Sequence, residues 1–270
     1  MPFSVLMSLY AKEHPDYLRE SLESVFSQSL PPSEVVLMED GPITEELQKV
    51  VKEYEAKHDT LKVIELPVNG GLGKALNEGL KHCSNDLVIR MDTDDICFPQ
   101  RFEKQVRFML EHPEVSVCSA WVEEFIYTPD NIVSTKVVPE NNDEIIKFGK
   151  SRCPINHPAV IYRKKDVIKS GGYGPFPEDY YLWGRMIMHG FKFFNLQEPL
   201  LYFRSSKDVY KRRGGWKYFK AMNVLQKELF RIGYLKRIEW IRNMGIRTVI
   251  TLLPNNLRSL FYRSFLRKSK

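Results

Sequence analysis

Residues 87–99 have the sequence Leu-Val-Ile-Arg-Met-Asp-Thr-Asp-Asp-Ile-Cys-Phe-Pro, and they decide which fold is expected. The first five form an apolar run of strand length, interrupted by Arg90, and Asp92, Asp94 and Asp95 follow directly. In open α/β sheets ligands bind outside the carboxyl ends of the strands, and adjacent carboxylates repel one another unless a cation or a proton intervenes. The pattern favours a divalent metal that also contacts a substrate phosphate. A turn with a helix cap, where Asp is also favoured, is the alternative interpretation.

Predicted strands and helices alternate on both sides of this stretch. Apolar runs predict further strands at residues 3–10, 34–38, 61–66 and 115–121. Helical spacing predicts helices at residues 15–26, 44–58 and 101–112, and one that a glycine-rich loop opens and that ends near residue 82. This alternation predicts an α/β fold with a doubly wound, mostly parallel sheet.

The glycine-rich loop has the sequence Asn-Gly-Gly-Leu-Gly-Lys-Ala-Leu-Asn at residues 69–77. Backbone amides at the start of a helix can hold a phosphate, which would make the loop part of a ligand site. The spacing is not that of a P-loop, because Val68 stands where that pattern needs glycine. A tight turn with a glycine for helix packing explains the residues equally well.

The composition of the 270 residues is that of an ordinary globular protein, with 43% hydrophobic and 27% charged side chains. The first residues lack the pattern of a signal peptide and no apolar run approaches about 18 residues, so we expect a cytoplasmic protein. The cysteines form no close-spaced pairs, and we expect them to be reduced and mostly buried. They are Cys83, Cys97, Cys118 and Cys153.

Charge divides the chain into two parts. Residues 205–270 contain 17 Lys and Arg against 3 Asp and Glu, whereas residues 1–204 contain 23 against 31. We therefore expect a metal-using catalytic domain at residues 1–204 and a basic helical C-terminal extension at residues 205–270.

The extension is expected to form helices at residues 216–232 and 238–253, and a third from residue 257. The third interleaves apolar residues with Lys and Arg, a pattern typical of a helix in the interface of an anionic membrane. A helical cap packed on the catalytic domain, with a solvated basic face, is the open alternative. A nucleic-acid partner is not expected, because no nucleic-acid module is recognisable and the front domain is acidic.

Several motifs carry a family resemblance. The first four are Ser-Val-Leu-Met-Ser-Leu-Tyr (4–10), Val-Leu-Met-Glu-Asp-Gly-Pro (36–42), Asn-Gly-Gly-Leu-Gly-Lys-Ala-Leu-Asn-Glu-Gly-Leu (69–80) and Arg-Met-Asp-Thr-Asp-Asp-Ile-Cys-Phe-Pro-Gln-Arg-Phe (90–102). Asn-His-Pro (156–158), Gly-Gly-Tyr (171–173) and Pro-Glu-Asp-Tyr-Tyr-Leu-Trp (177–183) follow. In this order, over about residues 3–204, the chain resembles family 2 glycosyltransferases of the GT-A fold. The similarity is to enzymes of bacterial capsule, exopolysaccharide and lipopolysaccharide O-chain assembly.

The resemblance implies a binding site for a nucleotide-sugar donor. Ser8 and Tyr10 match positions that hold the uracil ring of a UDP-sugar, and an aromatic side chain there can stack on a base. Asp40 matches the acid that accepts a hydrogen bond from the uracil, while Glu39 replaces the more usual aspartate. A UDP-sugar is therefore the expected donor, and GDP- and dTDP-sugars stay open.

The acids after the central strand match the family's Asp-x-Asp element, which binds the ribose and a divalent metal, Mn²⁺ or Mg²⁺, that bridges the diphosphate. By this resemblance we predict Asp92 and Asp94 as donor-binding residues and Asp94 and Asp95 as metal ligands. The sequence does not show which of these three aspartates binds the ribose and which bind the metal.

Asp179 matches the family's general base. An inverting displacement needs one carboxylate to take the proton of the acceptor hydroxyl and a cation to stabilise the leaving UDP. Glu178 either orients the acceptor or tunes Asp179, or is an acid favoured at a helix N-terminus. Tyr181 stands where many relatives have another acid. His157 falls where relatives keep a histidine beside the sugar or diphosphate, and a loop histidine bonded to backbone is the alternative.

Together these features predict an inverting, metal-dependent hexosyl- or N-acetylhexosaminyltransferase of bacterial surface polysaccharide biosynthesis. The expected acceptor is a lipid-linked glycan, reached from the cytoplasmic face of the inner membrane. Leu-Tyr-Phe-Arg at residues 201–204 replaces the Gln-x-x-Arg-Trp element of processive synthases, so we expect one sugar per encounter. A nucleotidyltransferase acting on sugar phosphates also needs clustered acids, but it has no use for Asp179. A noncatalytic nucleotide-sugar-binding protein would bind the donor without transfer.

Overall fold

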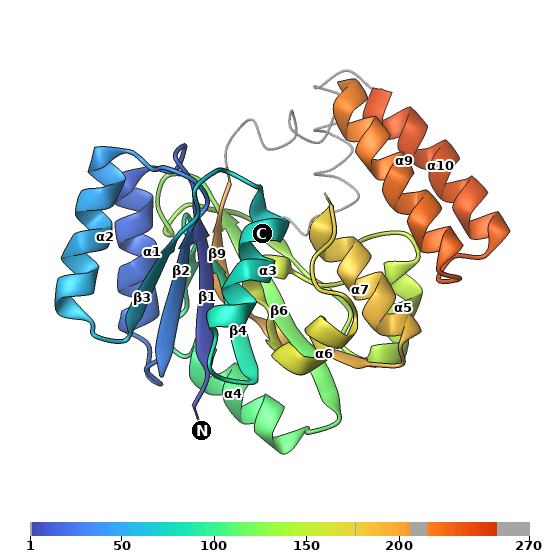
Figure 1. Cartoon of the computed structure of the whole chain (residues 1–270). Coiled ribbons are helices and arrows are strands. Elements are labelled where there is room, and N and C mark those ends of the chain that lie inside the picture. The colour runs from blue at the N-terminus through green and yellow to red at the C-terminus, as the bar shows by residue number, and fades with distance from the viewer. Residues whose placement is uncertain (1, 176, 206–214, 253–270) are drawn as a thin grey trace.

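A mixed sheet forms the centre of the described chain (Figure 1). The structure is a computed structural model and describes residues 2–175, 177–205 and 215–252. The strand order is β3-β2-β1-β4-β8-β6-β9-β5, and β7 pairs with β6. The strands are β1 (Ser4–Leu9), β2 (Glu34–Glu39), β3 (Leu61–Glu65), β4 (Leu87–Asp92), β5 (Ile96–Cys97), β6 (Val115–Phe125), β7 (Ile132–Lys136), β8 (Ile161–Arg163) and β9 (Lys192–Arg204).

Helices cover both faces of the sheet, because successive residues of each strand point to opposite faces and both sets are apolar. One hydrophobic cluster joins the sheet to α1 (Pro15–Phe26), α2 (Glu45–Lys57) and α4 (Arg101–Glu111). The other joins it to α3 (Leu72–His82), α5 (Asn142–Gly149), α6 (Lys164–Lys169) and α7 (Glu178–Met188). The 3₁₀ helix η1 (His157–Ala159) precedes β8.

The predicted α/β fold with a mostly parallel sheet is confirmed. β3, β2, β1 and β4 run parallel, as do β6 and β9, and β8 joins the two sets as an antiparallel strand. The predicted strand at residues 115–121 is longer, and it continues to Phe125. β5, β7 and β8 were not predicted, because runs of two to five residues carry little periodic pattern.

The carboxyl ends of β1, β2 and β4 meet at one edge of the sheet. In the register of these strands Ser8 lies opposite Asp92, and Leu9 lies opposite Glu39. Residues that follow the three strands are therefore brought together, although they are far apart in sequence. This edge carries the acids that the sequence singled out.

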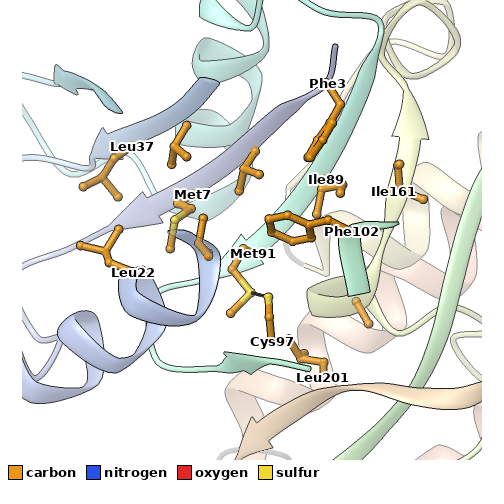
Figure 2. Packing of buried hydrophobic residues seen from close by; sticks show 14 of the residues in the cluster. Phe3, Met7, Leu22, Leu37, Ile89, Met91, Cys97, Phe102, Ile161 and Leu201 are labelled. Carbon is orange, nitrogen blue, oxygen red and sulfur yellow. Dashed lines mark hydrogen bonds between the residues drawn. The ribbon is translucent and has the colours of Figure 1, made fainter. Parts of the chain in front are cut away.

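The turn after β4 is anchored in the hydrophobic core on both sides (Figure 2). Met91 and Cys97 are buried, and the Cys97 thiol donates to Sδ of Met91 at 3.5 Å. The backbone N–H of Cys97 donates to Oγ of Ser24 in α1 at 3.0 Å. The backbone around the acids is thus fixed by packing and does not depend on the acids themselves.

Two helices of the C-terminal part, α9 (Gly215–Arg231) and α10 (Arg237–Leu252), form a hairpin beside α7 (Figure 1). Leu229 and Tyr234 pack with Tyr180 of α7 in a third hydrophobic cluster. The two helices predicted at residues 216–232 and 238–253 are confirmed over the described residues. The third, predicted from residue 257, lies outside the described residues. None of the described helices is both long and apolar enough to cross a membrane.

Candidate active site

Three carboxylates gather in the turn between β4 and β5. One oxygen from each of Asp92, Asp94 and Asp95 lies within 4.8 Å of the others. Asp95 is fully buried, and its Oδ1 accepts a hydrogen bond from the backbone N–H of Arg204 at 2.8 Å. Its Oδ2 is also buried and has no hydrogen-bond partner in the described part of the chain. An acceptor oxygen of this kind is suited to a cation.

Asp94 and Asp95 have raised pKa values and so hold their protons more tightly than isolated aspartates do. Burial, followed by the charges of Asp92 and Glu13, raises the pKa of Asp94 to about 7. Burial, followed by the charges of Asp94 and Asp92, raises the pKa of Asp95 well above its usual range. Hard divalent cations prefer carboxylate oxygens and relieve this repulsion, so the donor set fits Mn²⁺ or Mg²⁺.

Arg90 lies beside the cluster with a fully buried guanidinium group. Nη1 and Nη2 donate to the two carboxylate oxygens of Asp92 in a bidentate pair. Arg90 and Asp92 are two residues apart on β4, so both side chains point to the same face of the sheet. Asp92 is therefore oriented and neutralised by the protein, in contrast to Asp94 and Asp95.

The loop after β2 places Asp40 against the glycine-rich loop. Oδ1 of Asp40 accepts from the N–H of Gly70 at 2.7 Å, and Oδ2 accepts from the N–H of Gly71 at 2.9 Å. Gly71 has φ of 87° and precedes the first residue of α3, a conformation that favours glycine. These two amides hold Asp40, as expected for a turn. Asp40 is buried, and its role toward uracil stays a prediction.

Ser8 and Tyr10 lie at the exit of β1. Ser8 is paired with Asp92 across the β1–β4 register, and its carbonyl accepts from Oγ1 of Thr93 at 3.4 Å. Tyr10 follows the strand and is exposed. The structure therefore brings Ser8 to the acid cluster, and contact of Ser8 or Tyr10 with a base stays a prediction.

α7 brings Glu178 and Asp179 to the same region in its first turn. Burial and the charge of Asp179 raise the pKa of Glu178, while Arg90 acts in the opposite direction. Oδ2 of Asp179 accepts a long hydrogen bond of 3.6 Å from the thiol of Cys153. The charges of Arg90 and Asp92 also act on the pKa of Glu178, so the start of α7 lies within electrostatic range of the end of β4.

His157 is buried in η1, and its Nε2 lies 3.1 Å from the hydroxyl of Tyr173. Burial and the positive charges of Arg90 and Lys136 lower its pKa well below the usual range. The imidazole is therefore neutral and serves as a hydrogen-bonding group. The partner of Nε2 is a side chain, and the role of His157 beside a sugar or diphosphate stays a prediction.

Two arginines of the site were not predicted. Arg90 was visible in the sequence as the charged residue within an apolar strand run. Arg204 ends β9, and its Nε donates to the carbonyl of Asp94 at 2.8 Å while its guanidinium lies 4.0 Å from the ring centre of Tyr17. No local pattern marks Arg204, because its hydrogen-bond partners are at least 77 residues away in the chain.

The chain matches the model of glycosyl transferase family 2 over residues 4–172 and belongs to that family. A relative in Haemophilus influenzae, described as an uncharacterized glycosyltransferase, is 46% identical over 99% of this chain and 100% of its own length. The Escherichia coli UDP-Gal:α-D-GlcNAc-diphosphoundecaprenol β-1,3-galactosyltransferase is 39% identical over 98% of this chain and 97% of its own. The amylovoran biosynthesis glycosyltransferase AmsE of Erwinia amylovora is 40% identical over 96% of this chain and 97% of its own.

Solved structures share the fold at lower identity. S. aureus TarS in complex with UDP-GlcNAc gives a TM-score of 0.69 at 21% identity, over 92% of this chain and 72% of that one. The mannosyltransferase PcManGT of Pyrobaculum calidifontis, in complex with GDP-Man and Mn²⁺, gives a TM-score of 0.65 at 14% identity, over 95% of this chain and 71% of that one. The chain is thus a glycosyltransferase with a GT-A fold.

Proposed function

We propose that this glycosyltransferase moves a hexosyl or N-acetylhexosaminyl group from a UDP-sugar to a lipid-linked glycan, with inversion and with a divalent metal. The observation that carries the proposal is the meeting of the β4 acids and the α7 acids around Arg90. Relatives that match over nearly their whole length support a lipid-linked acceptor in polysaccharide biosynthesis. One of them is named for its action on a diphosphoundecaprenol-linked sugar, and another is named for amylovoran biosynthesis. The position of the enzyme at the cytoplasmic face of the inner membrane is part of the same proposal.

Asp94 and Asp95 would hold the metal, which would neutralise the charge that develops on the departing diphosphate. The manganese in the mannosyltransferase complex supports Mn²⁺ as one such ion. Asp92 would accept hydrogen bonds from the ribose, and its pairing with Arg90 supports a fixed orientation for that role. UDP complexes of TarS support uracil as the base, next to Ser8 and Tyr10.

Asp179 takes the proton of the acceptor hydroxyl on one carboxylate oxygen. The acceptor oxygen then forms a bond to the anomeric carbon while the bond from that carbon to the diphosphate breaks on the opposite side. The configuration at the anomeric carbon inverts, and no covalent intermediate forms. General-base catalysis of this kind contributes about 10²- to 10⁴-fold to the rate.

The first experiment is a calorimetric titration of the protein with UDP, GDP and dTDP, each with Mn²⁺ or with a chelator. We expect UDP to bind, and only with the metal. Asp94→Asn should weaken metal-dependent UDP binding about tenfold or more. Asp130→Asn, which changes an exposed turn aspartate, is the matched control. Metal-independent binding of UDP, or unchanged affinity in Asp94→Asn, would contradict the metal assignment.

Transfer is tested separately with a UDP-sugar and a lipid diphosphate-linked acceptor sugar. Asp179→Asn should retain UDP binding and lose turnover about 10²-fold or more. Asp143→Asn removes an exposed carboxylate from the first turn of α5 and should retain both properties. Full turnover in Asp179→Asn would place the base elsewhere, and donor binding without transfer in the unchanged protein would favour a noncatalytic binding role.

A further inference from the structure

The outer face of α10 is apolar and exposed. Ile238, Ile241, Ile246 and Val249 are 72%, 51%, 52% and 63% exposed. At 100° per residue these four positions span an arc of about 140° on the helix. A surface helix of a globular protein normally turns such a face toward the core.

The opposite face of α10 is already bound, so the apolar face is not the result of a loosely placed helix. Glu239 pairs with Nζ of Lys150 at 2.9 Å, and Nδ2 of Asn243 donates to the carbonyl of Lys150 at 2.6 Å. A guanidinium N–H of Arg247 donates to the carbonyl of Ser151 at 2.8 Å. These positions recur every four residues and fix the rotation of the helix about its axis.

We propose that this outer face lies in the interface of an anionic lipid bilayer. Exposed Arg242 lies within this arc and exposed Arg237 lies beside it, and no acidic residue lies within the arc on the described helix. A second copy of the chain would bring the same cations against each other, which disfavours a dimer. Residues 253–270 follow α10 in the sequence and add five Lys and Arg with no Asp or Glu. Aliphatic side chains flanked by cations are the chemistry of an interfacial helix.

The inference deepens the proposed function, on which it rests for the lipid-linked acceptor. α10 belongs to the hairpin that packs on α7, and the first turn of α7 carries Asp179 (Figure 1). A surface that holds this hairpin to the bilayer keeps the enzyme at the membrane where its acceptor resides. The surface itself needs neither donor nor acceptor.

The test is co-sedimentation of the full chain with vesicles that contain phosphatidylglycerol, compared with pure phosphatidylcholine vesicles, without donor or acceptor. The triple variant Ile238→Ser, Ile241→Ser, Val249→Ser should lower the partition coefficient about tenfold or more. Arg237→Gln with Arg242→Gln should lower it on anionic vesicles by about fivefold for each charge.

Ile168→Ser is the matched control, because Ile168 is 56% exposed on α6, and it should bind vesicles like the unchanged protein. All variants should keep the thermal midpoint, since the changed side chains are exposed. Unchanged partition of the triple variant, or partition lost only on deletion of residues 257–270, would overturn the inference. A dimer in light scattering that the triple variant abolishes would also overturn it. Transfer to a water-soluble acceptor analogue, measured in parallel, reports on the proposed function alone.

Discussion

Removal of the buried guanidinium group in Arg90→Met is expected to lower the free energy of unfolding by about 3 kcal/mol. Breaking a buried ion pair by removing one partner costs about 3 to 5 kcal/mol, because the other charge stays behind. We expect the lower end of this range of destabilisation for Arg90→Met, because the Asp92 side chain that stays behind is 28% exposed and water can reach it. Met matches the length of the Arg stem, so little cavity is left.

Urea denaturation at neutral pH with a chelator measures this effect in a double-mutant cycle. Asp92→Asn leaves a buried cation and should also destabilise, whereas the double variant should recover about 2 kcal/mol relative to the sum of the single effects. Arg107→Met changes an exposed arginine of α4 and should stay within about 0.5 kcal/mol of the unchanged protein. A loss below about 1 kcal/mol in Arg90→Met, or strict additivity in the cycle, would refute the ion-pair reasoning.

Three further outcomes are expected. Because the pKa of Asp94 is raised to about 7 in the metal-free protein, manganese affinity measured by calorimetry should fall by up to about tenfold per pH unit below that value, and a flat profile would contradict this. Burial raises the pKa of Glu34, but hydrogen bonds from Lys62 and other donors outweigh it and lower the pKa to about 2. Ionised Glu34 should therefore add about 3 kcal/mol to the free energy of unfolding above pH about 4.5, and this stabilisation should be lost as the pH falls toward 2. In urea denaturation measured against pH, Glu34→Gln should make the free energy of unfolding depend less on pH in this acidic range. In Gly73→Ala the new Cβ would lie 2.8 Å from the carbonyl oxygen of Gly174, in the segment that leads into α7, and should displace Asp179. We therefore expect kcat to fall about tenfold or more and UDP affinity to change less. Equal losses in kcat and in UDP affinity would argue against a displacement of Asp179.

The strands that carry the site could be predicted because they are buried, apolar and followed directly by acids. β1, β2 and β4 each fit this description, and a parallel sheet brings their carboxyl ends to one edge. The pairing of Arg90 with Asp92 also follows from the strand period of two, once the strand is accepted. The fold and the acid cluster were therefore accessible from local patterns.

Contacts between distant segments could not be predicted in this way. The amides of the glycine-rich loop bind Asp40 across 30 residues, and the thiol of Cys153 reaches Asp179 across 26. Arg204 contacts Asp95 across 109 residues. No spacing rule links such positions, because the sheet order and the packing of α7 determine them. The division of the chain at residue 204 likewise stays a prediction.

Arg90 connects the two halves of the site through its charge. Burial raises the pKa of Asp94 and Asp95 on one side and that of Glu178 on the other, and the charge of Arg90 counteracts part of this rise in all three. The same charge lowers the pKa of His157 and keeps that imidazole neutral. A fixed cation at this place offsets part of the repulsion among the acids, so that a metal does not have to offset all of it. This compensation favours a site that stays folded when no metal is bound.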